Sequence, residues 1–369
     1  MDSTCKIVLA ASSFEFFMAK SYFLHQSPPA IAEMLLLLIS AFCLLMTDAS
    51  IGVCYGTLGD NLPSPPQVIA LCNKYNINRI RLYNPNQAIL QALKGNLSIS
   101  VIVGIPNEEL PGIARNTSTA KSWVRNNILN YANVNFRYIA IGNEISPSSN
   151  LAPYVVPSMQ NIHSAISAAR LGNKIKVSTS LSMEVLAQSY PPSTGEFNSE
   201  ILSSFITPIV NFLAKNQSPL LLSVYPYFAY SSNMKDISLA YALFTSPSTV
   251  VKDGNYEYQN LFDAMVDATN AALEKTGGTN VEIVVSESGW PSAGGTATTL
   301  ENARIYNSNL IKHVEKGTPR RPGKPVETYL FDLIDENQKS PELEKHWGLF
   351  LPNQQPKYPM TFDKNTMND

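Results

Sequence analysis

The chain has 369 residues, with 27 Lys and Arg against 29 Asp and Glu, which gives a formal net charge of −2. Hydrophobic residues make up 44% of it, an ordinary share for a globular protein. Binding to nucleic acid or to an anionic membrane would call for a basic patch, and the sequence shows no such cluster, so these partners are not expected. A large and nearly neutral substrate fits this balance better.

Residues 1–50 are predicted to be a cleaved targeting segment. Residues 35–46 (LLLLISAFCLLM) form an apolar run that is shorter than the roughly 20 residues needed to span a bilayer. A run of this length is typical of the core of a secretion signal. Small residues follow it, so cleavage is expected after Ala49 or Ser50. The alternatives are a membrane anchor and a buried helix.

Other features agree with secretion. Three sequons are present, at Asn96, Asn116 and Asn216. Two cysteines remain after residue 50, Cys54 and Cys72, and a secreted domain of this size does not depend on disulfides. Because one is placed on a strand and the other on the following helix, both are expected to be buried thiols. A bridge between them is the alternative.

Eight β-rich runs alternate with helix-like stretches after residue 50. The runs are 51–56, 77–83, 97–106, 136–144, 174–180, 219–227, 281–288 and 326–335. Most are nearly continuous in Val, Ile, Leu, Tyr and Phe, which indicates burial on both faces, as parallel strands require. Helices are expected between them, for example at 66–75, 120–130, 156–169, 258–275 and 300–316.

Eight such alternations predict an α/β fold, a single closed (β/α)8 TIM barrel over residues 51–362. An open doubly wound sheet is the alternative. That fold would more often show a glycine-rich phosphate loop after the first strand, and residues 55–60 (YGTLGD) lack the G-x-G-x-x-G pattern. Residues 363–369 are expected to be a short polar tail.

Two glutamates stand where such a barrel carries its active residues, at the carboxyl ends of strands. Glu144 ends the fourth run and Glu287 lies near the end of the seventh. A buried glutamate costs several kcal/mol unless it is paired, so a structural ion pair with an arginine is the alternative for each. The fourth and seventh strands lie on opposite sides of an eight-stranded barrel, so both side chains can face each other across its mouth.

Glycoside hydrolysis would use such a pair. Retaining glycosidases need a neutral carboxylic acid and an ionised carboxylate about 5–5.5 Å apart. Asn143, beside Glu144, suits a hydrogen-bond donor to the sugar 2-hydroxyl, a contact that strengthens in the transition state.

Several motifs carry a specific resemblance. They are IGVCYG, RIRLYNPN, FRYIAIGNEISP, SVYPYFAY, IVVSESGWPSAG, YLFDLIDENQK and EKHWGLF. In order and spacing they resemble plant endo-β-1,3-glucanases of glycoside hydrolase family 17, over residues 51–362. The resemblance implies that Glu144 is the acid/base and Glu287 the nucleophile. It also implies endo action with retention on 1,3-β-glucans such as callose or fungal wall glucan, in defence or wall remodelling.

Aromatic residues near strand ends are expected to line the cleft, because the apolar faces of sugar rings stack on them. The candidates are Tyr83, Tyr225, Phe228 and Trp290, with core packing as the alternative for each. Tyr83 could also donate a hydrogen bond to Glu287.

The resemblance places Glu336 and Lys339 near the catalytic pair. Lys339 could help keep Glu287 ionised, and Glu336 could bond a sugar hydroxyl. The alternative is a surface salt bridge between them, which would contribute little. Glu344 is carried over only weakly, because its spacing from Glu336 is one residue short of the usual one.

Other chemistries find no support. His163, His313 and His346 form no H-x-x-H pattern, so neither a metal nor a cofactor is expected. Residues 286–289 are not a G-x-S-x-G elbow. The rival functions are a 1,3;1,4-β-glucanase of the same family, a non-catalytic β-glucan-binding wall protein and a transglycosylase. The mature protein is expected to be a monomer in the apoplast or cell wall, without a membrane anchor, and the vacuole is the alternative location.

Overall fold

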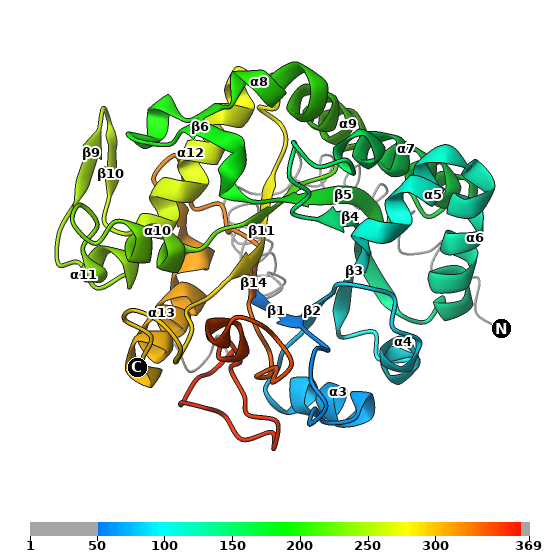
Figure 1. Cartoon of the computed structure of the whole chain (residues 1–369), viewed down its shortest axis with the longest axis horizontal. Coiled ribbons are helices and arrows are strands. Elements are labelled where there is room, and N and C mark those ends of the chain that lie inside the picture. Colours follow the sequence, from blue (N-terminus) through cyan, green and yellow to red (C-terminus); the bar gives the residue numbers. More distant parts are fainter. Residues whose placement is uncertain (1–50, 363–369) are drawn as a thin grey trace, which may run out of the picture. The chain divides into compact units, whose positions relative to one another are not determined.

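Eight parallel strands close into a barrel in the computed structural model, which describes residues 51–362 (Figure 1). In chain order the strands are β1 (Ile51–Tyr55), β2 (Arg79–Leu82), β3 (Ser100–Ile105), β4 (Asn135–Asn143), β5 (Lys176–Leu181), β8 (Leu220–Ser223), β11 (Ile283–Ser288) and β14 (Thr328–Leu330). Each strand pairs with the next in this order, and β14 pairs with β1 to close the ring. The predicted (β/α)8 barrel is confirmed. The expected signal segment, 1–50, and the tail, 363–369, lie outside the described residues.

The strands are buried along nearly their whole length, as their uninterrupted apolar runs indicate. Every residue of β3 and of β11 is buried. Two strands lose regular register close to their carboxyl ends, β4 between Ala140 and Asn143 and β11 between Val285 and Glu287. Such irregularities redirect side chains, and they often lie beside functional residues. Here they precede the two glutamates of interest.

Helices surround the barrel. They include α3 (Pro65–Lys74), α4 (Gln87–Leu93), α5 (Leu110–Arg115), α6 (Thr117–Asn127), α7 (Ala152–Ala168), α9 (Thr207–Asn216), α12 (Leu261–Lys275) and α13 (Leu300–His313). Side chains at their first turns explain several starts. Asn260 caps α12 by accepting from the Asp263 N–H at 2.8 Å, and Thr299 caps α13 by accepting from the Asn302 N–H at 3.0 Å.

Short elements extend the loops at the carboxyl ends of the strands. They include α8 (Ser199–Ile201), α10 (Pro226–Ser232), α11 (Leu239–Ala242) and two hairpins, β6 (Leu186–Gln188) with β7 (Glu196–Phe197) and β9 (Val251–Asp253) with β10 (Tyr256–Tyr258). A third hairpin joins β12 (Gly317–Thr318) to β13 (Arg321–Pro322). Figure 1 shows β6, β9, β10, α10 and α11 gathered around α12, outside the ring of strands.

Two predicted strands are shorter than expected. The run 219–227 ends as a strand at Ser223, because Pro226 starts α10, where its missing N–H is not needed. The run 326–335 ends as a strand at Leu330. Beyond it the backbone bonds to irregular segments instead, with the Asp332 N–H donating to the Trp347 carbonyl at 3.0 Å and the Leu333 N–H to the Cys54 carbonyl at 2.9 Å.

The cysteine prediction is confirmed, since Cys54 and Cys72 are both buried free thiols. Within residues 51–362, no helix combines the length and the apolar character needed to cross a membrane.

Candidate active site

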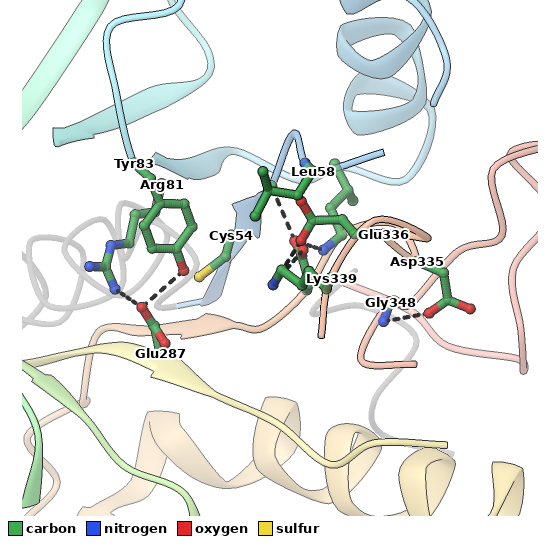
Figure 2. Close-up of polar contacts among 12 residues, drawn as sticks. Cys54, Leu58, Arg81, Tyr83, Glu287, Asp335, Glu336, Lys339 and Gly348 are labelled. Carbon is green, nitrogen blue, oxygen red and sulfur yellow. Dashed lines mark hydrogen bonds and ion pairs between the residues drawn. The ribbon is translucent and has the colours of Figure 1, made fainter. Parts of the chain in front are cut away.

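Glu287 lies near the carboxyl end of β11 with both carboxylate oxygens occupied. Oε1 accepts from the Tyr83 hydroxyl at 2.9 Å and pairs with Nη1 of Arg81 at 2.8 Å (Figure 2). Oε2 accepts from the Tyr225 hydroxyl at 2.7 Å. Only 5% of the residue is exposed, so these donors replace the water that an ionised carboxylate would otherwise keep. The hydrogen bond expected from Tyr83 is present.

Arg81, on β2, connects the two sides of the barrel mouth. It is 1% exposed, and its Nη1 also donates to the Ser286 carbonyl at 3.0 Å. Its Nη2 donates to Oδ1 of Asn143, and the guanidinium lies 4.7 Å from the centre of the Tyr83 ring. Arg81 was not among the predicted site residues. Its position could have indicated a role there, because it is a charged residue inside an apolar strand, two positions before Tyr83 and therefore on the same face.

Glu144 directly follows β4 and has a left-handed backbone, with φ of 47°. This conformation is disfavoured for a residue with a Cβ, and it persists here because the Glu144 N–H donates to the Ser180 carbonyl at 3.0 Å. The side chain is accessible and lines a cavity of about 690 Å³. The cavity is also lined by Glu184, Ser223, Tyr225, Phe228 and Ser232, among others.

The pKa of Glu144 is raised to about 7. Loss of hydration is the main cause, because the side chain meets solvent only through the cleft, and the negative charge of Glu287 adds to it. The Ser223 hydroxyl and the Arg81 guanidinium act in the opposite direction but do not cancel the effect. A carboxyl group that keeps its proton up to neutral pH can serve as a general acid.

Asn143 is oriented by its neighbours. Arginine can only donate, so the amide atom that faces Arg81 is the oxygen. The Asn143 backbone is held from both sides by Asn107, whose Oδ1 accepts from the Asn143 N–H at 2.7 Å and whose Nδ2 donates to the Asn143 carbonyl at 3.1 Å. Within residues 51–362, no acceptor engages Nδ2 of Asn143, so this group remains available to a ligand.

Two of the predicted aromatic residues join Tyr83 at the mouth. Tyr225 precedes α10, and Phe228 lies in its first turn, with 43% of its surface exposed. Their ring centres are 5.4 Å apart, and the Phe228 ring lies 5.6 Å from that of Trp347. Packing on these neighbours holds the Phe228 ring while leaving part of it open to the cleft.

Trp290, which was expected to line the cleft, is buried instead. It is 0% exposed, its Nε1 donates to the Ala297 carbonyl at 3.0 Å, and its ring packs against Tyr227 and Tyr306. The expected stacking on substrate is wrong, because no face of the indole is open. Gly289 allows the chain to pass close to Phe331, because a Cβ there would lie 2.3 Å from the Phe331 carbonyl oxygen, and the following Trp290 packs between α10 and α13.

Glu336 and Lys339 form a buried pair rather than the surface salt bridge that was the alternative. Glu336 Oε2 lies 2.8 Å from Lys339 Nζ, and Oε1 accepts from the Leu58 N–H (Figure 2). This approach requires Gly56, where a Cβ would lie 2.3 Å from Glu336 Oε2. The ammonium also lies 4.1 Å from the centre of the Phe331 ring. The family resemblance placed Lys339 where it could help keep Glu287 ionised. In the structure Lys339 pairs with Glu336, and the cation that pairs with Glu287 is Arg81.

Glu344 is partly buried nearby. Burial raises its pKa, Lys339 and the Trp347 side chain lower it, and Glu287 is close enough to add a small upward effect. Among the described residues, no group of three His, Cys, Asp or Glu side chains could hold a metal ion.

The barrel mouth thus carries two carboxyl groups in different environments. One is buried and held by a cation and two hydroxyl donors, and the other is accessible and retains its proton to about pH 7. An ionised carboxylate and a nearby carboxylic acid are the two groups that double-displacement hydrolysis of a glycoside requires.

Comparison with known proteins agrees with this geometry. Residues 51–362 match the family model of glycosyl hydrolases family 17. The basic isoform of glucan endo-1,3-beta-glucosidase from Phaseolus vulgaris is 53% identical over 321 residues, which cover 86% of this chain and 92% of that protein. A basic vacuolar isoform from Nicotiana plumbaginifolia is 51% identical over 344 residues, covering 92% and 93%.

Solved structures agree as well. A β-1,3-glucanase and allergen of Cryptomeria japonica pollen is 46% identical, with a TM-score of 0.82 over 85% of this chain and 99% of that one. A structure from a study of two plant β-glucan endohydrolases with distinct substrate specificities is 48% identical, with a TM-score of 0.81 over 84% and 100%. The chain therefore belongs to glycosyl hydrolases family 17.

Proposed function

We propose that this protein is an endo-1,3-β-glucanase that cleaves internal bonds of 1,3-β-glucan with retention of configuration. Glu144 is the acid/base and Glu287 the nucleophile. The observation that carries the proposal is the difference between them: Glu287 is held by Arg81, Tyr83 and Tyr225, whereas Glu144 faces the cavity with a pKa of about 7.

In the first step, the protonated Glu144 gives its proton to the glycosidic oxygen as the bond from that oxygen to the anomeric carbon breaks. A carboxylate oxygen of Glu287 forms a bond to the anomeric carbon, which yields a covalent glycosyl-enzyme. Oε2 accepts one hydrogen bond, from Tyr225, whereas Oε1 has both Tyr83 and Arg81. Oε2 is therefore the less stabilised oxygen and the better nucleophile.

In the second step, Glu144 is a carboxylate and removes a proton from water as the water attacks the anomeric carbon. The bond to Glu287 breaks, and both groups return to their starting states. Asn143 supports both steps, because its free Nδ2 can donate to the sugar 2-hydroxyl as positive charge develops on the ring.

The substrate assignment draws on the relatives and on the cleft. Relatives at 51–54% identity are named as glucan endo-1,3-beta-glucosidases. The exposed Phe228 ring offers a stacking surface to a sugar. Glu336 is 2% exposed and paired with Lys339, and neither residue lines the cavity beside Glu144.

The test is product analysis on laminarin, which is 1,3-linked, and on mixed-linkage barley glucan. Short 1,3-oligomers from laminarin, released with the β configuration as read by NMR, are expected. Action on the mixed-linkage glucan alone would move the assignment to a 1,3;1,4-β-glucanase. No turnover of either by folded protein would favour a β-glucan-binding wall protein.

We propose that residues 1–50 direct the chain into the secretory pathway and are removed, and that the mature monomer acts in the apoplast in defence or wall remodelling. Two of the relatives are named as vacuolar isoforms, which keeps the vacuole as the other destination. Amino-terminal sequencing of the mature protein and localisation of a fluorescent fusion decide between these.

A further inference from the structure

A second buried charged cluster lies in the loop after β14. It contains two carboxyl groups, Asp332 and Glu336, each 2% exposed, and the ammonium of Lys339. If all three groups were ionised, the cluster would hold one uncompensated negative charge away from water. Such a charge costs several kcal/mol or is removed by taking up a proton.

The hydrogen bonds indicate where this proton would lie. Asp332 Oδ1 accepts from the Leu333 N–H at 2.6 Å and from the Gly56 N–H at 3.3 Å. In the described part of the chain no N–H group or hydroxyl donates to its Oδ2, and Lys339 Nζ is 4.0 Å from this atom, beyond hydrogen-bond reach.

Glu336 faces this oxygen. The two carboxyl groups are in contact, and their oxygens Asp332 Oδ2 and Glu336 Oε2 lie on either side of Lys339 Nζ, at 4.0 Å and 2.8 Å. Two carboxylates have four acceptor oxygens and no hydrogen to share, so this contact requires a proton on one of them. Glu336 already accepts from the Leu58 N–H and pairs with Lys339, so its anion is the better stabilised of the two.

We propose that Asp332 stays protonated at neutral pH and donates its hydrogen from Oδ2 to Oε2 of Glu336, as a positioning residue that holds Glu336 and Lys339 in place. The Lys339–Glu336–Asp332 cluster is then electrically neutral, and every buried oxygen in it has a partner.

The surroundings support this assignment. Burial raises the pKa of Asp332 well above its ordinary value, and the Glu336 carboxylate raises it further. The positive charge of Lys339 lowers this pKa but does not cancel the increase. Burial also acts to raise the pKa of Glu336, but the hydrogen bond from Asp332 and the charge of Lys339 outweigh it and leave that pKa lowered. From β1, Cys54 and Tyr55 face Asp332, and burial raises the pKa of both, so they bring no charge.

The cluster is connected to the cleft through Phe331. Lys339 lies over this ring, and the ring packs edge-on against Tyr83 and Tyr225, at 6.4 Å and 6.2 Å between centres. Both tyrosines donate to Glu287. Displacement of Lys339 would therefore disturb the residues that hold the proposed nucleophile.

Two substitutions separate a protonated Asp332 from an ionised one. In Asp332→Asn, the amide oxygen can accept from Leu333 and Gly56, and the amide NH₂ can donate to Glu336, so the protonated arrangement is reproduced. Asp332→Ala removes these hydrogen bonds. If Asp332 were instead an anion that stabilised Lys339, both the Asn and the Ala variants would lose that stabilisation.

The first measurement is thermal stability against pH. A carboxyl group whose pKa is raised in the folded state stabilises the fold most at low pH, and this contribution is lost as pH rises from its unfolded value toward its folded value. Wild type should therefore lose stability relative to Asp332→Asn from about pH 4 upward. At pH 8 the Asn variant should melt higher by about 2 °C or more. An Asn variant that becomes steadily less stable than wild type with rising pH would overturn the proposal.

The second measurement is an infrared difference spectrum of wild type against Asp332→Asn at pH 7. The carbonyl band of a protonated carboxylic acid should remain in the wild-type-minus-variant difference, because the band of the partly protonated Glu144 is common to both proteins and cancels. The absence of this band from the difference spectrum would overturn the proposal whatever the enzyme's activity.

The third measurement rests on the proposed glucanase activity. Asp332→Ala should lower kcat/KM on laminarin by about tenfold or more, whereas Asp332→Asn should restore it to within about twofold of wild type. Equal losses in the two variants would refute the positioning role. A wild type without any glucanase activity would refute the proposed function instead, and the first two measurements would still decide the state of Asp332.

Discussion

Two glutamates with little exposed surface, at opposite ends of the barrel, have similar partners. Glu287, at the carboxyl end, has Arg81, Tyr83 and Tyr225. Glu327, which precedes β14 at the amino end, is held by two arginines at 2.9 Å each and by two tyrosine hydroxyls at 2.9 Å and 3.2 Å. These residues are Arg79, Arg137, Tyr329 and Tyr138.

The two ends differ in what lies opposite the glutamate. At the carboxyl end, Glu144 follows an irregular strand end, faces a cavity and has a raised pKa. At the amino end, Glu327 lines a smaller cavity of about 220 Å³ together with Glu282, and Glu282 is accessible but paired with Lys324 at 2.7 Å. A glutamate held by arginine and tyrosines is therefore not in itself a site. The second carboxyl group with a raised pKa turns the carboxyl end into one.

Replacement of Glu287 tests this contrast most strongly. Glu287→Gln should lower kcat on laminarin by at least about 10³-fold in a protein that still folds, because an amide cannot form the covalent intermediate. The matched control is Glu327→Gln, which should leave kcat within about twofold and lower the free energy of unfolding by roughly 1–3 kcal/mol. Near-normal hydrolysis by Glu287→Gln would remove the mechanism proposed here.

Replacement of Glu144 should be nearly as damaging, but selectively so. Glu144→Gln should lose about 10²–10⁴-fold on laminarin, where the leaving oxygen needs a proton, and much less on aryl glycosides whose leaving group needs none. Because the acid must be protonated and its pKa is about 7, wild-type kcat/KM should fall as pH rises above that value. A pH–rate profile measures this fall in kcat/KM. If the same fall remains in Glu144→Gln, a group other than Glu144 causes it.

Arg81 should contribute geometry as well as charge. Arg81→Lys keeps the cation but cannot bridge Glu287 and Asn143, so kcat/KM should fall by roughly 10–100-fold. The same change at the other end of the barrel, Arg79→Lys, should lower the thermal midpoint and leave kcat/KM near wild type. Similar activity losses in the two variants would mean that the ends are not functionally distinct.

The smallest effect is expected at the cleft wall. Phe228→Ala should raise KM for laminarin by roughly three- to tenfold, because a stacking surface worth about 0.5–1.5 kcal/mol is lost. Trp290→Phe, at the buried position, should lower stability without altering KM. A rise in KM in the Trp290 variant alone would mean that Trp290 contacts the substrate after all.

The sequence by itself determined the barrel and the position of its two glutamates. The segments 101–103 (VIV) and 283–285 (IVV) are apolar on both alternating faces, so they had to become strands covered on both sides. Once eight such runs alternate with helices, Glu144 and Glu287 must lie at the same end of the barrel, because all parallel strands point the same way.

Only the tertiary structure decided which groups meet. Arg81 and Glu287 are 206 positions apart, and nothing local to either residue reveals that barrel closure brings them within 2.8 Å. The burial of Trp290 depended on its packing against Tyr227 and Tyr306, and the partner of Lys339 on the path of the loop after β14. Periodicity reports the faces of single elements, whereas pairing, burial of a loop residue and the resulting pKa values arise from contacts between elements distant in the chain.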